Sequence, residues 1–483
     1  MTRERSALER AFGHALAHLE SLDTRPVAAT AGLEALRRAL GRPLPDRGTS
    51  AVQVIDDLVA DTAGGVMGSQ SGRFFGWVIG GGLPAAMAAD WLTTAWDQNA
   101  GIYACSPAAS VVEEIAGGWL KDLFGLPADA SFAFVTGTQM AHVTCLAAAR
   151  HAVLARRGWD IGRRGLQGAP RVRILASADR HGSVDRALRL LGFGSDGIEP
   201  LAVDAAGEVT RDTLGAALAT SDDPVIVVLQ AGELNLAAFD PFEQLAPVAR
   251  DAGAWIHVDA AFGLWARVSP AHRHRASGIE LCDSWTTDGH KYLNVPYDSG
   301  FAFVRDAAAH RAAMTLATSY LPPGGPARDP LDWNPEFSRR ARGFAAYAAL
   351  RELGCDGLAE LVERTCRHAH ALTTRIGSLP GAELVATSGF NQGLVRFLAS
   401  RPGATAIDHD RRTDQVIAAI NASGEALFGG VTWRGRRAMR ISVSNWRTTE
   451  RDVDRAVAAA RLAAVGPASL EELPAPGSQR PSA

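Results

Sequence analysis

The stretch DSWTTDGHKYLNVPYDSGFAF, residues 283–303, places Lys291 between His290 and Tyr292, ahead of a proline-bearing turn and a predicted buried strand. The chain of 483 residues has 47 arginines but only one other lysine, Lys121. Lysine is normally among the commonest residues, so chemistry that needs a primary amine has two positions to choose from. Because arginine cannot form a Schiff base, Lys291 is a candidate for covalent binding of an aldehyde cofactor. The alternative role for Lys291 is that of a surface lysine.

Lys121 offers a contrast, in the segment EEIAGGWLKDLFGL. Its position on the polar side of an amphipathic pattern predicts a solvated helix face. Lys291 is therefore the stronger candidate of the two.

The bulk composition is that of a globular protein with two or three domains: 47% of the residues are hydrophobic and 21% charged. A net charge of −3 without a basic block argues against a nucleic-acid partner. No apolar run is long enough to span a membrane, and the amino terminus MTRERSALER lacks a signal-peptide core. The five cysteines are scattered without CxxC spacing, so neither disulfides nor zinc are indicated. We expect a cytoplasmic enzyme without a metal.

The middle of the chain alternates apolar runs with amphipathic helical patterns, which predicts βα units and a mainly parallel sheet. The predicted strands are FAFV near residue 132, VRILAS near 172, PVIVVLQ near 224, AWIHVD near 254 and GFAFV near 300. Ligand sites in such sheets lie beyond the carboxyl ends of the strands. The residues that follow each run are therefore the candidates for chemistry.

Four segments are expected from the pattern. Residues 1–65 form a helical segment, and a loop-like stretch, 64–84, opens a large domain over 66–330. A proline- and glycine-rich loop (320–330) leads to a smaller α/β domain over 331–465, with a helix at 338–353, an alternating strand pair and a helix at 449–464. The tail 466–483 is predicted to be disordered.

Three further segments bear candidate residues after apolar runs. In HVDAAFG, Asp259 either caps the next helix or pairs with the ring nitrogen of a pyridine cofactor. The Thr-Gly-Thr-Gln turn of FVTGTQMAHV opens a helix, and such a turn is a natural phosphate site. His181, in ADRHGSVDRA, is either structural or stacked on the cofactor ring. Together with Lys291, all of them fit pyridoxal 5′-phosphate (PLP).

With these motifs in place, the sequence resembles the group II PLP-dependent decarboxylases, which include aromatic amino acid, glutamate and histidine decarboxylases. The similarity runs from RFFGWVIGGGLP (73–84) through HVDAAFG and HKYLNVPYDSG to RISVSNWRTT, roughly four-fifths of the chain. It implies a fold-type I α/β enzyme with a mainly parallel seven-stranded sheet in the large domain. It also implies a homodimer that shares its active sites.

The resemblance assigns roles residue by residue. Lys291 matches the Schiff-base lysine, Asp259 the partner of the pyridinium nitrogen, and His181 the ring-stacking histidine, which can also transfer protons. The remaining positions of the expected cofactor site are Gly137, Thr138, Gln139, Ala261, Asp288 and His290. Trp77 and Phe75 of the RFFGWVIGG segment, with Tyr103 and Tyr320, are candidates for the substrate pocket; packing at a domain or dimer contact is their alternative role.

The expected reaction is decarboxylation of an L-amino acid to its amine and CO₂, through an internal aldimine on Lys291. The bond that breaks is the one held perpendicular to the ring, so the residue that positions the carboxylate decides the reaction. Another PLP reaction at Cα, either decarboxylative oxidation to an aldehyde or aldol-type cleavage, is the alternative. A non-catalytic scaffold with the cofactor fold is a third hypothesis. The sequence does not identify the amino acid.

Two departures from the family pattern stand out. In AGELNLAAFDP (231–241), Glu233 and Leu234 replace the usual threonine pair, and Glu233 is expected to face solvent. In the mobile loop, Pro330 takes the place of a tyrosine that protonates the carbanion in aromatic amino acid decarboxylases. No tyrosine occurs between Tyr320 and Tyr347. Either Tyr320 or His181 supplies the proton, or the carbanion has another fate such as oxidation.

Other patterns are weaker. The HxH pairs His272/His274 and His368/His370 are embedded in arginines, which disfavour a divalent cation, and are expected at the surface. Arg440, in MRISVSNW, is a candidate carboxylate or phosphate partner among 47 arginines. No GxSxG, Walker A or GxGxxG motif is present.

Overall fold

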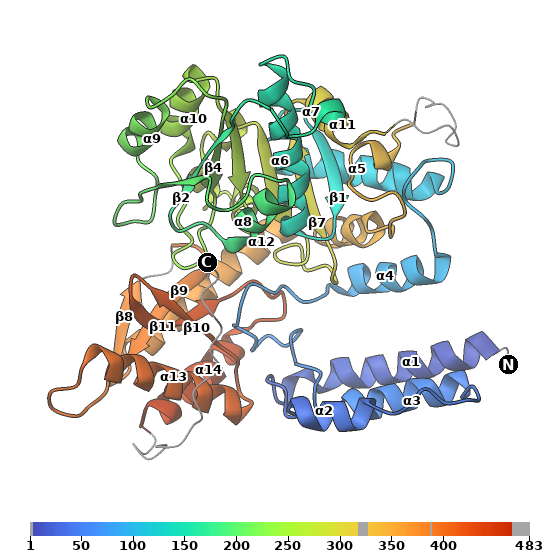
Figure 1. The fold of residues 1–483 in the computed structure, drawn as a ribbon. Coiled ribbons are helices and arrows are strands. Elements are labelled where there is room, and N and C mark those ends of the chain that lie inside the picture. Colours follow the sequence, from blue (N-terminus) through green and yellow to red (C-terminus); the bar gives the residue numbers. More distant parts are fainter. Residues whose placement is uncertain (1–2, 317–326, 387–388, 466–483) are drawn as a thin grey trace.

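The structure is a computed structural model that describes residues 3–316, 327–386 and 389–465. Two sheets organise it, and in Figure 1 the larger lies above the smaller, with helices α1 to α3 beside the smaller one. Tyr320 and the tail 466–483, predicted above to be a pocket residue and a disordered segment, lie outside the described residues.

The larger sheet has seven strands in the order β1-β7-β6-β5-β4-β2-β3, and β7 alone runs antiparallel to its neighbours. This confirms the mainly parallel seven-stranded sheet. The strands are β1 (Ser131–Val135), β2 (Arg173–Ser177), β3 (Ile198–Leu201), β4 (Val225–Gln230), β5 (Trp255–Asp259), β6 (Ser284–Asp288) and β7 (Gly300–Val304). The sequence predicted five of them.

Apart from the edge strand β3, the strands of this sheet are buried on both faces, which is why most of them read as continuous apolar runs. In β1, Phe132 and Phe134 join the core on one face, while Ala133 and Val135 join the core on the other. The small residues lie on the face that α6 (Thr138–Ala155) crosses, and α6 itself is rich in alanine. The large aromatic residues fill the opposite face.

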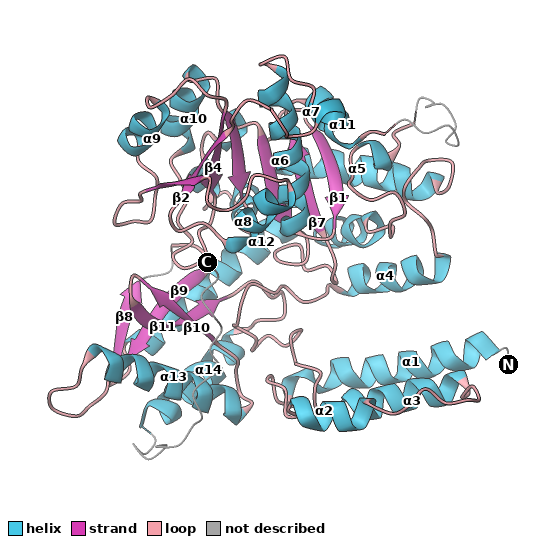
Figure 2. Cartoon of the chain, viewed as in Figure 1, coloured by secondary structure: helices cyan, strands magenta, loops and turns pink. Residues whose placement is uncertain are grey.

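Helices cover both faces of this sheet (Figure 2). Those of the larger unit are α5 (Pro107–Phe124), α6, α7 (Ile161–Arg164), α8 (Gly182–Leu190), α9 (Arg211–Leu218), α10 (Phe242–Asp251) and α11 (Ala307–Met314). Single 3₁₀ turns follow β5, and they carry part of the aromatic core.

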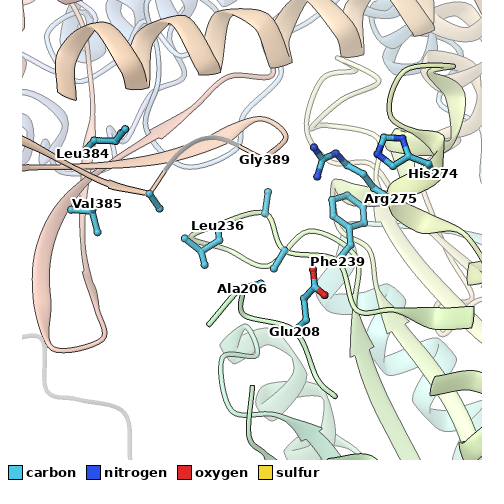
Figure 3. A pocket seen from close by; sticks show the side chains of 12 residues that line it. Ala206, Glu208, Leu236, Phe239, His274, Arg275, Leu384, Val385 and Gly389 are labelled. Atoms are coloured by element: carbon cyan, nitrogen blue, oxygen red, sulfur yellow. The ribbon is translucent and has the colours of Figure 1, made fainter. Parts of the chain in front are cut away.

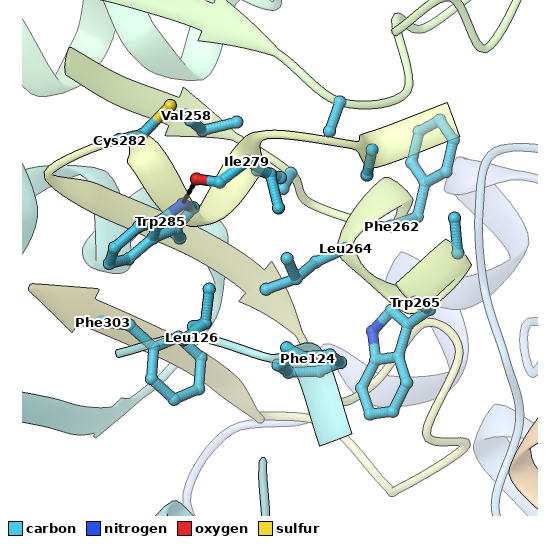
Figure 4. Packing of buried hydrophobic residues seen from close by; sticks show 14 of the residues in the cluster. Phe124, Leu126, Val258, Phe262, Leu264, Trp265, Ile279, Cys282, Trp285 and Phe303 are labelled. Atoms are coloured by element: carbon cyan, nitrogen blue, oxygen red, sulfur yellow. Dashed lines mark hydrogen bonds between the residues drawn. The ribbon is translucent and has the colours of Figure 1, made fainter. Parts of the chain in front are cut away.

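The aromatic core fixes the neighbouring strands β5 and β6. Trp285 of β6 is fully buried and donates from its indole to Ile279 O at 2.8 Å (Figure 4). Beside it, Phe124 meets Trp265 edge to face, with ring centroids 5.0 Å apart. Burying such side chains contributes about 2–3 kcal/mol each. The two strands that end in Asp259 and Asp288 are therefore held rigidly side by side.

The smaller sheet has four strands in the order β10-β11-β9-β8, so the predicted strand pair was incomplete. Its strands are β8 (Ala382–Ala386), β9 (Gln392–Phe397), β10 (Gly429–Trp433) and β11 (Arg436–Ser442), and its helices are α13 (Ala406–Ser423) and α14 (Glu450–Val465). The helix predicted at 338–353 begins later and runs much further, as α12 (Gly343–Gly377) with a break at Gly354. It packs against both α4 and β9, and so links the two units.

The amino-terminal segment forms α1 (Arg3–Glu20), α2 (Leu33–Leu40) and α3 (Ala51–Thr62), and α4 (Pro84–Trp96) follows the irregular stretch. These helices expose large apolar side chains to an unusual degree, among them Leu8 (66%) and Leu58 (51%). In the described ranges, no helix is both long and apolar enough to cross a membrane.

Candidate active site

The residues predicted for the cofactor site meet in one cavity of about 880 Å³ at the carboxyl ends of β1, β2, β4, β5 and β6. Strand order brings them together, because these parallel strands all end at the same edge of the sheet. Its lining includes Trp77, Gly137, Thr138, Gln139, His181, Asp259, Ala261, Asp288, His290, Lys291, Tyr297 and Arg440.

Lys291 lies on the cavity wall, with its amine 2.9 Å from Asp288 Oδ2 and 5.8 Å from the centroid of the Phe262 ring. Its backbone is fixed from two sides. The Asn294 side chain donates to Lys291 O, and a Cβ at Gly80 would come within 1.8 Å of that same oxygen. Glycine is therefore required at residue 80, where the backbone of the glycine run 80–82 closely approaches the lysine segment.

Asp288 ends β6 and holds two parts of the site. Its Oδ1 accepts a 2.6 Å hydrogen bond from Thr138 N at the start of α6, while Oδ2 contacts the Lys291 amine. Burial by itself would raise the pKa of this carboxyl, but Lys291 and His290 outweigh burial and hold the pKa below its usual value. Asp288 is therefore ionised at neutral pH.

The start of α6 has the unsatisfied polar groups that a phosphate would need. Thr138 Oγ1 and Gln139 Nε2 are buried and have no hydrogen-bond partner among the described residues. They follow Gly137, at the positive end of the helix dipole. Buried donors without a partner are rare in folded proteins, so these groups fit an anion such as the PLP phosphate.

Asp259 ends β5, and its carboxylate is held from two sides. Ala261 N donates to Oδ1 at 3.2 Å, and His142 Nε2 lies 3.4 Å from Oδ2. Burial acts to raise the pKa of Asp259, yet His142, His181 and Lys291 together hold the pKa well below its usual range. A buried, permanently ionised carboxylate suits a cationic ring nitrogen.

His181 precedes α8, and Ser183 N donates to its Nδ1 at 3.2 Å. Since Nδ1 accepts, the neutral ring bears its proton on Nε2. Burial lowers the pKa of His181 below the usual histidine value, although Asp259 opposes this effect. A neutral imidazole at the cavity wall can stack on a ring or exchange a proton.

Of the described residues that were predicted to line the substrate pocket, one lies in the cavity wall and two do not. Trp77 lines the cavity. Phe75 does not, because it is fully buried against Phe428 in the core of the smaller unit, with ring centroids 5.2 Å apart. Tyr103 is not part of the lining either; its N–H is bonded to Asp329 Oδ1, and its side chain is 40% exposed.

Three further expectations were wrong. Glu233 does not face solvent: it is 1% exposed and accepts hydrogen bonds from Asn235 and Leu236 N–H groups. Burial raises its pKa. Lys121 is half-buried rather than solvated, and its amine donates to Ala130 O at 2.9 Å. Of the HxH residues expected at the surface, His368 is buried.

Sequence reasoning missed Tyr297 as a side chain of the cavity and named Arg440 only as a weak candidate. Arg440 of β11 lies in the wall, and burial lowers its pKa to about 10. Among the described residues its guanidinium makes one long hydrogen bond, 3.5 Å from Nη1 to Leu234 O, which leaves most of its donors for a ligand. Tyr297 stacks on His290 with centroids 4.2 Å apart. Only the surrounding motif could have indicated Tyr297, and Arg440 is hidden among many arginines.

A second cavity, of about 630 Å³, lies between the 236–239 loop and β8 (Figure 3). Glu208, His274 and Arg275 are its polar side chains. Neither lysine of the chain lines it, so an aldehyde cofactor has no amine to react with there. The larger cavity is the candidate active site.

Comparison with known proteins agrees with this assignment. Residues 34–400 match the family model described as the pyridoxal-dependent decarboxylase conserved domain. The chain belongs to this family. The decarboxylase is an α/β enzyme of fold type I, a PLP-dependent carboxy-lyase that acts on amino acids, with PLP as its cofactor.

Its relatives differ in the reactions their names describe. L-2,4-diaminobutyrate decarboxylase of Rhizobium meliloti (strain 1021) is 30% identical over 375 residues, covering 75% of this chain and 72% of that protein. 4-Hydroxyphenylacetaldehyde synthase of Rhodiola rosea is 25% identical, covering 90% of each chain. The crystal structure of Oryza sativa TDC with PLP and tryptamine superposes with a TM-score of 0.88 at 25% identity, covering 95% of this chain and 97% of that chain.

Proposed function

We propose that this decarboxylase converts an L-amino acid to its amine and CO₂, with PLP attached covalently to the Lys291 amine. The observation that carries the proposal is the convergence of Lys291, Asp259 and the unsatisfied donors of Thr138 and Gln139 on one cavity. When bound, PLP supplies an electron sink for the charge left at Cα. The chain's own residues hold the cofactor and orient the substrate.

Each cofactor contact has a proposed residue. Thr138 and Gln139 would bind the phosphate, Asp259 would face the ring nitrogen, and His181 would pack on the ring. Ala261, which is half-buried in the wall, leaves room beneath the ring. Asp288 orders the start of α6 and the lysine amine together.

Arg440 is the proposed partner of a substrate carboxylate. Its guanidinium is nearly buried, lines the cavity, and has donors to spare. A planar guanidinium can donate two parallel hydrogen bonds to the two oxygens of a carboxylate. It comes from β11 of the smaller sheet, whereas the α6 turn belongs to the larger unit.

Tyr297 is the proposed proton donor to Cα after CO₂ has left. Partial desolvation at the cavity wall and the nearby Asp288 raise the pKa of its phenol to about 12, so the proton is present at neutral pH, although the residue is 61% exposed in the single chain. The ring is fixed by stacking on His290. This role replaces the loop tyrosine that the chain lacks, and amine formation is then the expected outcome.

Formation of an aldehyde is the second candidate. It is supported by the absence of tyrosine from residues 321–346 and by the similarity to 4-hydroxyphenylacetaldehyde synthase. That reaction needs dioxygen as the oxidant and releases peroxide and ammonia along with CO₂, so its products distinguish it from simple decarboxylation.

A panel of L-amino acids tests the proposal. The purified holoenzyme is incubated with each, and CO₂, amine, aldehyde and peroxide are followed; Lys291→Ala is the inactive reference and Lys121→Ala the matched control. Amine and CO₂ in equal amounts support the proposal, whereas aldehyde and peroxide without amine support the second candidate. Failure of every amino acid to react would contradict both.

We also propose a homodimer. The apolar side chains on α1, α3 and α4 are exposed in a single chain, and Phe12 and Trp91, edge to face at 5.8 Å, show that these helices adjoin. Exposed apolar patches of this extent mark association surfaces.

A further inference from the structure

A chain of buried polar groups leads from Asp259 into the core of the larger sheet. His142 Nε2 lies 3.4 Å from Asp259 Oδ2, and on the other side of its ring Nδ1 is 2.8 Å from His257 Nε2. His257 Nδ1 is in turn 2.9 Å from Ser284 Oγ, and this oxygen receives the indole N–H of Trp255 at 2.9 Å. His142, His257 and Ser284 are all fully buried.

The donors along this chain can be assigned from one end. An indole N–H can only donate, so Ser284 Oγ accepts from Trp255 and has its own proton available for His257 Nδ1. The proton of His257 is then on Nε2 and points to His142 Nδ1. The remaining N–H of His142 is then on Nε2, which lies 3.4 Å from Asp259 Oδ2 and has no hydrogen-bond partner of good geometry among the described residues.

The reverse order is unfavourable. If His257 donated to Ser284 instead, neutral His142 would present a lone pair to the Asp259 carboxylate, 3.4 Å away. Two buried hydrogen-bond acceptors, the ring nitrogen and the carboxylate, would then face each other without a proton between them, which is costly in a low dielectric. Adding a proton to His257 is no remedy, because burial holds the pKa of His257 well below the usual histidine value.

We propose that His142 is a positioning residue that holds Asp259 ionised and oriented toward the cofactor ring, with its own tautomer fixed by His257, Ser284 and Trp255. The inference rests on the proposed role of Asp259. No substrate reaches His142, because its side chain is fully buried. Its effect passes entirely through the carboxylate.

The physical consequence concerns one proton. A proton between a ring nitrogen and a carboxylate settles on the nitrogen only if the carboxylate anion is stabilised. The His142 N–H stabilises the anion, while burial alone favours a neutral carboxyl. Loss of His142 would thus let the proton move toward Asp259 and leave the ring nitrogen neutral.

The test is ¹⁵N NMR of the holoenzyme loaded with PLP labelled at the ring nitrogen, since the shift distinguishes protonated from neutral pyridine. His142→Leu removes the N–H donor. In His142→Asn the shorter side-chain amide can still bond to His257 but does not reach Asp259. His142→Gln places an amide N–H near the position of Nε2. The matched control is His310→Leu, which removes an equally buried histidine bonded to Ser131 and Trp333.

We expect His142→Leu and His142→Asn to shift the signal toward that of Asp259→Asn and to weaken PLP binding about tenfold, the order seen when outer partners of a bound group are removed. His142→Gln should restore the wild-type signal, and His310→Leu should not change it. If the ¹⁵N signal is that of the wild type in His142→Leu and His142→Asn but shifts in Asp259→Asn, the proposed role of His142 is overturned, while that of Asp259 stands. An unshifted Asp259→Asn would instead reject the role of Asp259 itself.

Discussion

Asp288 joins two functional groups through a single carboxylate. It is 2% exposed, orders the first N–H of α6 and pairs with the Lys291 amine. A buried carboxylate in this position keeps the phosphate turn and the lysine in register before the cofactor binds. The geometry of the site therefore depends on a residue that itself performs no chemistry on the substrate.

Replacing Asp288 by asparagine should destabilise the fold by about 2 kcal/mol, because the Lys291 amine loses its buried counter-charge. Urea unfolding of the protein without PLP measures the loss. Asp298→Asn removes an exposed carboxylate bonded to Arg342 and is the control, with an expected change below about 1 kcal/mol. Equal stability of Asp288→Asn and the wild type would contradict this view of the site.

Tyr297→Phe should lower the rate of amine formation about 100-fold, the usual effect of losing a general acid. The visible absorption of bound PLP should be unchanged, since the stacked ring on His290 is retained. Amine, aldehyde and CO₂ are measured together, so that a diverted reaction is seen. An unaltered rate would reassign proton donation to His181 or to Tyr320.

At the level of the elements, the loop between β4 and α10 separates the two cavities. Gly232 and Leu234 line the larger one, and residues 236–239 line the smaller. Asp240 closes the loop: its carboxylate accepts from Val209 N at 2.8 Å and Gln230 N at 2.7 Å. Burial raises its pKa to about 7, and Glu208 and Asp204 add to the effect.

This shift predicts a pH dependence of stability. A carboxyl whose pKa is raised by folding stabilises the fold fully below its unfolded pKa, about 4, and the contribution is lost as pH rises through 7. Between pH 6 and pH 8 the free energy of unfolding should therefore fall by about 1 kcal/mol on account of Asp240. Chemical unfolding at both pH values, for the wild type and Asp240→Asn, isolates this contribution. An identical pH dependence in both proteins would contradict it.

Elements with a strong apolar pattern could be predicted from the sequence, and others could not. The runs that became β1, β2, β4, β5 and β7 are apolar because both sheet faces are covered. β6 reads SWTTD, and its threonines are buried by hydrogen bonds to backbone oxygens of β5 and its loop rather than by apolar character. β3 is four residues long and contains Glu199 and Pro200, so its pattern resembles a loop.

The same distinction applies to the site. Lys291, Asp259 and the 137–139 turn follow strands and could be predicted, whereas Arg440 comes from the smaller sheet, and only tertiary packing brings it to the cavity. His142 looked like an ordinary helix residue. Its role depends on His257, 115 positions away in the sequence, and no local pattern connects the two.

At the scale of the whole molecule, the active-site cavity is lined by residues of both the larger and the smaller sheet. The amino-terminal helices form a separate apolar surface. Leu8 and Leu58 are both more than half exposed. Leu8→Glu combined with Leu58→Glu should shift the protein from dimer to monomer in light scattering coupled to size-exclusion chromatography. Leu462→Glu, at a leucine of α14 that is 76% exposed, should leave the dimer intact. A dimer that survives the double substitution would place the interface elsewhere.

The assignment of the lysine is the central claim, and the scarcity of lysine makes it directly testable. Borohydride reduction of the holoenzyme fixes PLP to the amine that binds it, and peptide mass spectrometry then locates the label. We predict a single label on the peptide that contains Lys291 and none on Lys121. A label on Lys121, or an unlabelled Lys291 peptide in active enzyme, would contradict the account.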